Sequence, residues 1–199
     1  MVMRGKAIRY LVYGQVCLYA GLFICVLVRP AGLGANAGIS YYGIYRDTIL
    51  PYVLALLGSA YFSIKVAEQY SSSETAIIKY AFLVMGLLTI GIMITPDSLS
   101  NFMDELHRAF GSCLFGLQLL FSSWLVVRSG YNLWLIAGTL LELAAGIAAY
   151  VYLAPQNGLL LQSQVVFQAA FAGVAMYALS RPAFGPSLVA ETPKRTGFD

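Results

Sequence analysis

The chain has 199 residues, of which 59% are hydrophobic and 11% are charged, and its formal net charge is +3. A soluble domain has about 45–50% apolar and about 25% charged residues, and a soluble fold of this length could not bury so much apolar surface. The composition therefore excludes a soluble enzyme, a disordered chain and a disulfide-stapled secreted domain. It predicts a polytopic membrane protein.

Six segments are long and apolar enough to cross a membrane, which takes about 20 residues because the hydrocarbon core is about 30 Å thick. In chain order they lie at about 8–28, 49–67, 77–95, 107–127, 131–153 and 158–179. Each is expected to be α-helical, because backbone groups in lipid must bond to one another. The sequence thus predicts an all-α, six-transmembrane-helix bundle over residues 1–182 and a cytoplasmic tail at 183–199.

The basic residues predict the orientation. With the N-terminus in the cytoplasm, nine of the twelve Lys and Arg residues fall on the inside. These nine are Arg4, Lys6, Arg9, Lys65, Lys79, Arg128, Arg181, Lys194 and Arg195, and the three outside are Arg29, Arg46 and Arg108. Because inner loops are enriched in basic residues, we expect both termini in the cytoplasm and the protein in the plasma membrane.

Glu142 lies near the middle of the fifth predicted span. A carboxylate at that depth costs several kcal/mol unless it is protonated or paired. Its helical neighbours are mostly small, which is typical of a face that packs against another helix: Gly138, Thr139, Ala145, Gly146 and Ala149. Glu142 is therefore a candidate proton carrier, ion ligand or general acid/base. The alternative is a neutral carboxyl that bonds a neighbouring helix, and its expected partners are the polar groups of the fourth or sixth span, particularly Gln118 and Gln168.

A second group of candidates lies at the outer rim. His107, the only histidine, is placed at the start of the fourth span, where it could act as a general base, a headgroup contact or an interfacial residue. Asp104 and Glu105 precede that span and suit the positive end of a helix. Arg46 and Asp47 precede the second span and are expected to pair with charges of the other outside loop.

Two short motifs resemble a known family. The first outside loop reads Ile-Ser-Tyr-Tyr-Gly at 39–43, and the fourth span begins Leu-His-Arg-Ala at 106–109. This pattern resembles the six-span FRAG/DRAM/SFK-type membrane family and its related prokaryotic domain of unknown function, although Gly38 stands where that family often has proline. The resemblance implies a role in lipid handling or membrane organisation, and it makes Ser40, Gly43 and His107 candidate positions.

These observations leave three functional hypotheses. The leading one is a non-enzymatic integral membrane protein that binds membrane lipid, or a partner membrane protein as a complex subunit, through its outer face. The alternatives are a small proton-coupled transporter using Glu142 and an intramembrane lipid hydrolase using His107 with Asp104 or Glu105. Cysteine and histidine spacing fits no metal site, and no cofactor or nucleic acid is expected. The candidate ligand-binding residues are Ser40, Gly43, Arg46, Asp47, Asp104, His107, Gln118, Glu142 and Gln168.

The predicted orientation can be tested by the accessibility of single cysteines introduced into a background without Cys17, Cys25 and Cys113. A membrane-impermeant thiol reagent should reach residues 30–47 from outside intact cells. It should reach residues 69–75 only after the cells are opened. Labelling of both segments from the same side would overturn the topology.

Overall fold

The computed structural model describes residues 2–34, 38–96, 100–152 and 158–181, and over these ranges it is helical with no strand. Six long helices are each apolar enough to cross a membrane, which confirms the predicted fold class. Their bounds are α1 Val2–Val28, α2 Ile49–Ala67, α3 Ala76–Ile94, α4 Asn101–Arg128, α5 Leu133–Tyr152 and α6 Leu160–Ser180. Three short 3-10 helices are η1 Pro30–Gly34, η2 Gly38–Ile44 and η3 Ser73–Thr75. The predicted tail at 183–199 lies outside the described residues.

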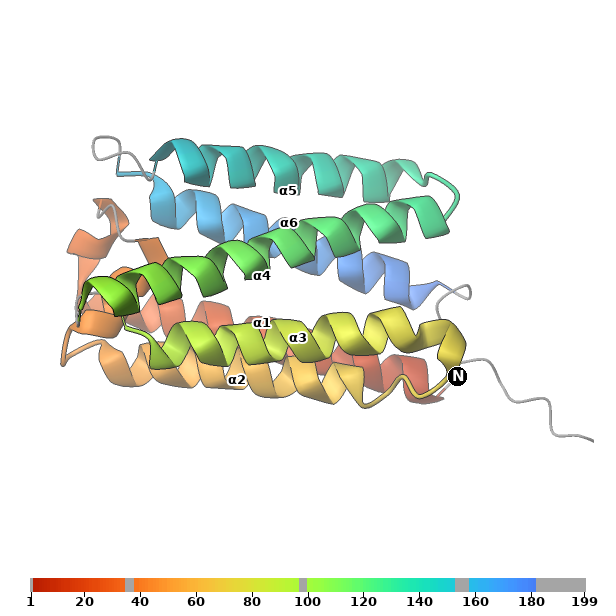
Figure 1. The fold of residues 1–199 in the computed structure, drawn as a ribbon, viewed down its shortest axis with the longest axis horizontal. Coiled ribbons are helices and arrows are strands. Elements are labelled where there is room, and N and C mark those ends of the chain that lie inside the picture. Colours follow the sequence, from red (N-terminus) through yellow and green to blue (C-terminus); the bar gives the residue numbers. More distant parts are fainter. Residues whose placement is uncertain (1, 35–37, 97–99, 153–157, 182–199) are drawn as a thin grey trace, which may run out of the picture.

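The six helices run up and down along one common axis (Figure 1). The start of α1 and the end of α6 lie at one end of the bundle, as an even number of spans requires. The segment that holds η1 and η2 lies at the opposite end, together with the start of α4. The two longer loops predicted to lie outside therefore do share one end of the protein.

Two helices begin earlier than the sequence predicts. The other four match the predicted spans within two residues, but α1 and α4 each begin six residues upstream. Helix α4 is capped by Ser100, whose hydroxyl accepts a hydrogen bond from the Met103 N–H at 3.2 Å. At 28 residues it is about 42 Å long, well above the roughly 30 Å of hydrocarbon. Asp104 and Glu105 therefore lie inside the helix, and His107 lies nearly two turns from its start.

Close packing between helices depends on small residues. A Cβ on Gly21 of α1 would approach the Pro51 carbonyl of α2 to 2.8 Å, so the two backbones are nearly in contact. Because hydrocarbon tails are as apolar as leucine, such shape complementarity drives helix association in membranes. Three aromatic rings fill the centre: Phe82 of α3 lies 5.6 Å from Phe121 of α4 and 6.4 Å from Phe171 of α6, centroid to centroid.

The segment between α1 and α2 is held by specific hydrogen bonds. The buried Thr48 hydroxyl donates to the Tyr42 carbonyl at 2.8 Å, and the Ile39 N–H donates to Oε1 of Gln164 on α6 at 2.8 Å. Just before that bond, Gly38 adopts φ +58°, and a Cβ there would collide with the Gln164 amide. Two separate constraints thus require glycine at position 38, and together they fix the position of Ser40.

A Gly38→Ala variant should therefore loosen this segment. The left-handed backbone alone costs a residue with a Cβ about 1–2 kcal/mol, and the collision with Gln164 adds to that cost. Gly34→Ala is the matched control, because a Cβ at Gly34 meets nothing within 4 Å. Thermal unfolding of the purified variants should show a lower melting temperature for Gly38→Ala alone, and equal temperatures would contradict this account of the segment.

Candidate functional site

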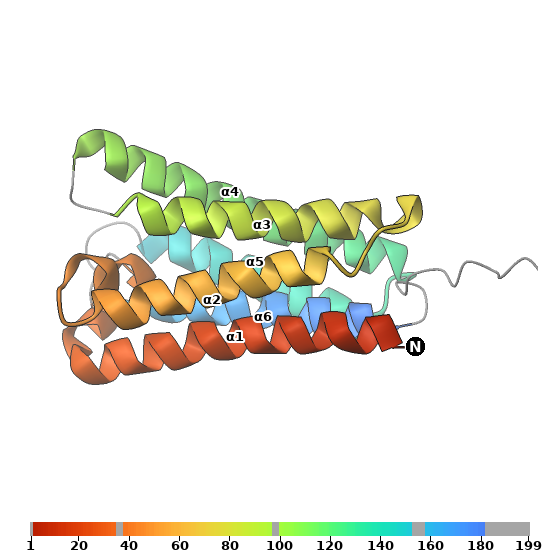
Figure 2. The same cartoon turned by 90° about the horizontal axis from the view of Figure 1, so that it is seen from below.

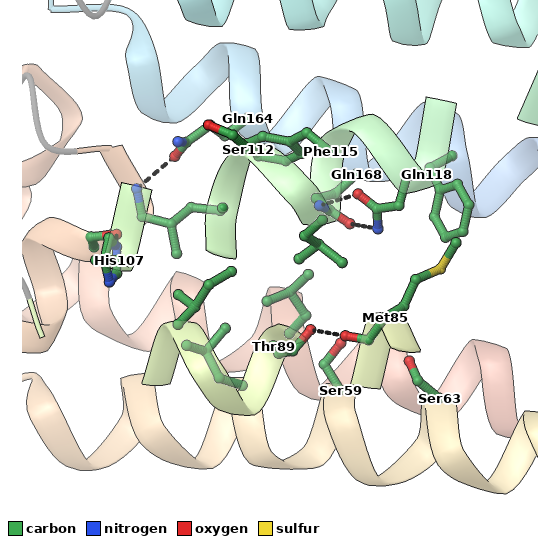
Figure 3. A pocket seen from close by; sticks show the side chains of 18 of the residues that line it. Ser59, Ser63, Met85, Thr89, His107, Ser112, Phe115, Gln118, Gln164 and Gln168 are labelled. Atoms are coloured by element: carbon green, nitrogen blue, oxygen red, sulfur yellow. Dashed lines mark hydrogen bonds between the residues drawn. The ribbon is translucent and has the colours of Figure 1, made fainter. Parts of the chain in front are cut away.

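A cavity of about 490 Å³ lies inside the bundle. It extends from His107 at one end to Ser63 and Met85 at the other (Figure 3). Helix α4 diverges from α3 toward its first residues (Figure 2). The volume falls within the roughly 300–1,000 Å³ usual for small-molecule sites, so the cavity can hold a ligand.

The lining of this cavity is mixed. Its apolar part is contributed by Leu11, Leu18, Ile39, Leu56, Phe82, Met85, Ile92, Leu114, Phe115, Leu160 and Phe171. Its polar part is contributed by Gln15, Ser40, Ser59, Ser63, Thr89, His107, Arg108, Ser112, Gln118, Tyr150, Gln164 and Gln168. Of these described residues only Arg108 carries a fixed charge, and none is Asp or Glu. The cavity is therefore suited to a ligand with an apolar part and an anionic or acceptor-rich part.

A short hydrogen bond in the lining joins Ser40 to His107. The Ser40 Oγ lies 2.5 Å from His107 Nε2, and His107 Nδ1 lies 2.6 Å from the Thr95 carbonyl oxygen. A carbonyl only accepts, so Nδ1 carries the proton, and in the neutral ring Nε2 then accepts from the Ser40 hydroxyl. His107 is 8% exposed. The structure thus fixes both the orientation and the tautomer of this imidazole.

The Thr95 carbonyl is available because α3 ends there. The last carbonyls of a helix have no partner within it, and Pro96, which lacks an N–H, favours a non-helical backbone at the preceding residue. Thr95 has φ −113° and ψ 66°, and its hydroxyl donates back to the Gly91 carbonyl at 2.7 Å. A ring N–H from α4 therefore satisfies a carbonyl that would otherwise be buried without a partner.

Deeper in the cavity, Gln118 of α4 and Gln168 of α6 form a reciprocal pair. Each amide donates to the oxygen of the other at 3.0 Å, and both side chains are buried. On α1, Oε1 of Gln15 is buried without a hydrogen-bond partner among the described residues. The amide groups therefore offer further donors and acceptors along the wall.

Glu142 is buried beside a polar group of the fourth span, as predicted, but that group is not one of the two glutamines named for it. Its side chain is fully buried, as expected, but its partners are not Gln118 and Gln168, which bond to each other instead. The neighbouring polar group is the Ser122 hydroxyl of α4, and in the described part of the chain neither carboxyl oxygen makes a hydrogen bond of ordinary geometry. Glu142 is not among the residues that line the cavity. The structure therefore separates it from the Ser40–His107 end.

The remaining rim candidates lie outside the cavity lining. Asp47 pairs with Arg29 of the same segment at 3.0 Å, not with the other loop as predicted. The hydrogen bond to Asp47 raises the pKa of Arg29, and the Arg29 guanidinium also lies 3.8 Å from the Tyr45 ring centroid. Arg46 and Glu105 are exposed, and Asp104 is half-buried.

Gly43, the remaining candidate from the family resemblance, has a packing role. A Cβ at this position would lie 2.7 Å from the Tyr52 ring. Glycine there lets the loop lie directly on α2.

One ring nitrogen of His107 bonds to Thr95 and the other to Ser40. Neither nitrogen is therefore free to bond to Asp104 or Glu105, the carboxylates that the hydrolase hypothesis combines with this histidine. Sequence reasoning missed Thr95 and Arg108 as parts of this site. The only signal for Thr95 was Pro96, which marks a helix end.

Comparison with protein-family models, curated proteins and solved structures found no match for this chain.

The Gln118–Gln168 pair should be measurable as a coupling energy. Interhelical hydrogen bonds in membrane proteins contribute about 0.6 kcal/mol on average and up to about 1.7 kcal/mol. Because two hydrogen bonds join this pair, its coupling energy should lie in the upper part of that range. Gln118→Leu and Gln168→Leu should each destabilise by stranding the other amide, while the double variant should lose less than the sum. Unfolding in a denaturing detergent would measure the cycle, and strict additivity would show that the pair is uncoupled.

Proposed function

We propose that this protein is an integral membrane protein that binds one amphipathic lipid in the cavity. The polar part of the ligand lies at the end formed by Ser40, His107 and Arg108, and its apolar chain extends toward Met85. The observation that carries this proposal is the mixed lining of a cavity of about 490 Å³ that lies among six apolar helices.

The charge of the lining favours an anionic or oxygen-rich headgroup. Arg108 supplies a fixed positive charge without a carboxylate in the lining to neutralise it. Arginine is well suited to phosphate and carboxylate groups, because its planar donors match their oxygens. The apolar part of the lining suits an acyl chain, because the transfer of apolar surface out of water is favourable.

A lipid ligand accounts for more of the structure than a partner membrane protein or a proton-coupled transporter does. A partner membrane protein would use the outer surface and would leave the internal cavity without a role. A proton-coupled transporter would need Glu142 in contact with the pathway, but Glu142 does not line the cavity. We place the protein in the plasma membrane with both termini cytoplasmic, on the basis of its basic residues. Membership of the FRAG/DRAM/SFK-type family stays a prediction.

Filling the cavity with Gly111→Leu should weaken lipid retention. Gly111 of α4 lines the cavity, and a Cβ there meets nothing within 4 Å, so the backbone at this position accepts a side chain. Overfilling an occupied site costs about 1–3 kcal/mol, and the middle of that range, about 2 kcal/mol, lowers affinity about 30-fold. Lipid that remains bound after purification, measured by mass spectrometry per mole of protein, should fall accordingly.

Gly116→Leu is the matched control. It lies on the same helix, is exposed, meets nothing within 4 Å and is outside the lining, so it gains the same helix propensity and should retain lipid like the wild type. Glu142→Gln should also retain lipid, since it keeps the shape of a side chain remote from the ligand. Equal lipid content in the Gly111 and Gly116 variants would contradict the proposed site.

A further inference from the structure

We propose that Ser40 is a nucleophile activated by His107, and that the protein hydrolyses a carboxylic ester of its lipid ligand. This inference rests on the proposed lipid site and names the reaction that occurs there. Three groups are connected in a row by hydrogen bonds. The Ser40 Oγ lies 2.5 Å from Nε2 of His107, and Nδ1 of the same ring lies 2.6 Å from the Thr95 carbonyl oxygen.

The arrangement has the parts that nucleophilic catalysis by serine requires. A serine is a weak nucleophile until an adjacent base removes its proton, and that base must be held by a third group. Here Nε2 is the base and the Thr95 carbonyl is the third group, because it accepts from Nδ1–H and turns the Nε2 lone pair toward Ser40. Ser40 is half-buried and lines the cavity, so a bound ester can reach its hydroxyl.

In the first half-reaction the Ser40 Oγ forms a bond to the ester carbonyl carbon, and the hydroxyl proton moves to Nε2. The bond between that carbon and the alcohol oxygen then breaks, and the departing alcohol takes the proton from Nε2. The products are a free alcohol and an acyl group esterified to Ser40. The Thr95 carbonyl stabilises the transient imidazolium through its hydrogen bond to Nδ1.

Water completes the cycle. A water molecule attacks the acyl carbon while Nε2 takes one of its protons, and the bond from carbon to Oγ breaks. The proton returns to Oγ, which releases a carboxylic acid and restores Ser40. Water can reach the site because Ser40 is half-buried and Arg108, which lines the same cavity, is exposed.

Two further groups suit the developing oxyanion and the substrate. Arg108 follows His107 in sequence and lines the same cavity. Gln164 holds the loop through its oxygen, which accepts from the Ile39 N–H at 2.8 Å, so its NH₂ is the donor that it can offer to a ligand. Preorganised donors of this kind stabilise the tetrahedral intermediate. The inferred substrate class is an ester of a long-chain carboxylic acid with an anionic or oxygen-rich headgroup.

The direct test is covalent labelling of the full-length protein in lipid nanodiscs with an alkyl fluorophosphonate, which phosphonylates activated serines with loss of fluoride. Mass spectrometry of the digested protein should find the adduct on Ser40. Ser40→Ala should lose it, whereas Ser123→Ala, an exposed serine of α4 outside the lining, should label like the wild type. Hydrolysis of a 4-nitrophenyl ester of a long-chain acid should follow the same order.

His107→Gln separates a chemical from a structural role. A glutamine amide can donate to the Thr95 carbonyl and accept from Ser40, so it can preserve the packing, but it cannot take a proton. General-base catalysis contributes about 10²–10⁴-fold, so labelling and hydrolysis should fall at least about 100-fold in a variant that still unfolds cooperatively. A wild-type protein that retains lipid but leaves Ser40 unlabelled would overturn the hydrolase and leave lipid binding intact, and a protein that retains no lipid would overturn the proposed function instead.

Discussion

The hydrogen bond from His107 to the Thr95 carbonyl is the contact on which the arrangement of the site depends. The last carbonyls of a helix have no partner within it, and Thr95 is buried where α3 ends before Pro96. The donor that satisfies this carbonyl is a side chain of α4, so the ends of α3 and α4 are joined where the two helices diverge. Since the imidazole has two nitrogens, satisfying one with a carbonyl commits the other as an acceptor. The Ser40 hydroxyl is the group that meets it.

The longest helix, α4, contributes to one wall of the cavity. Its 28 residues exceed what the hydrocarbon core requires, and its first turns diverge from α3 (Figure 2). The cavity is bordered by glutamine and serine side chains on several helices, which would be costly if they faced lipid. Gln118 and Gln168 satisfy part of that polarity by bonding to each other. The wall is thus polar enough to orient a ligand and apolar enough to hold an acyl chain.

The fold was predictable and the site was predictable only in part. Apolar runs of about 20 residues leave the backbone one solution in lipid, so the helices follow from composition. Glu142, Gln118 and Gln168 were correctly expected inside the bundle, but sequence gives depth and not helix rotation, so the glutamines were chosen as partners of Glu142 where Ser122 is its neighbour. Thr95 acts through a backbone carbonyl, which every residue has, and no side-chain pattern marks it. Ser40 was a candidate because of the Ile-Ser-Tyr-Tyr-Gly motif, but its contact with His107 could be found only in the tertiary structure.

The η2 segment has a consequence for biosynthesis. Its partners come much later in the chain: Ser40 is 67 residues before His107, and Ile39 is 125 residues before Gln164. At a synthesis rate of about 5–20 residues per second, the loop waits roughly 6–25 s for its last partner to be made. During that interval the first two helices are already in the membrane with the loop unattached. Ser40 can therefore meet His107 only after more than half of the chain has been made, and the hydrogen bond from Ile39 to Gln164 forms later still.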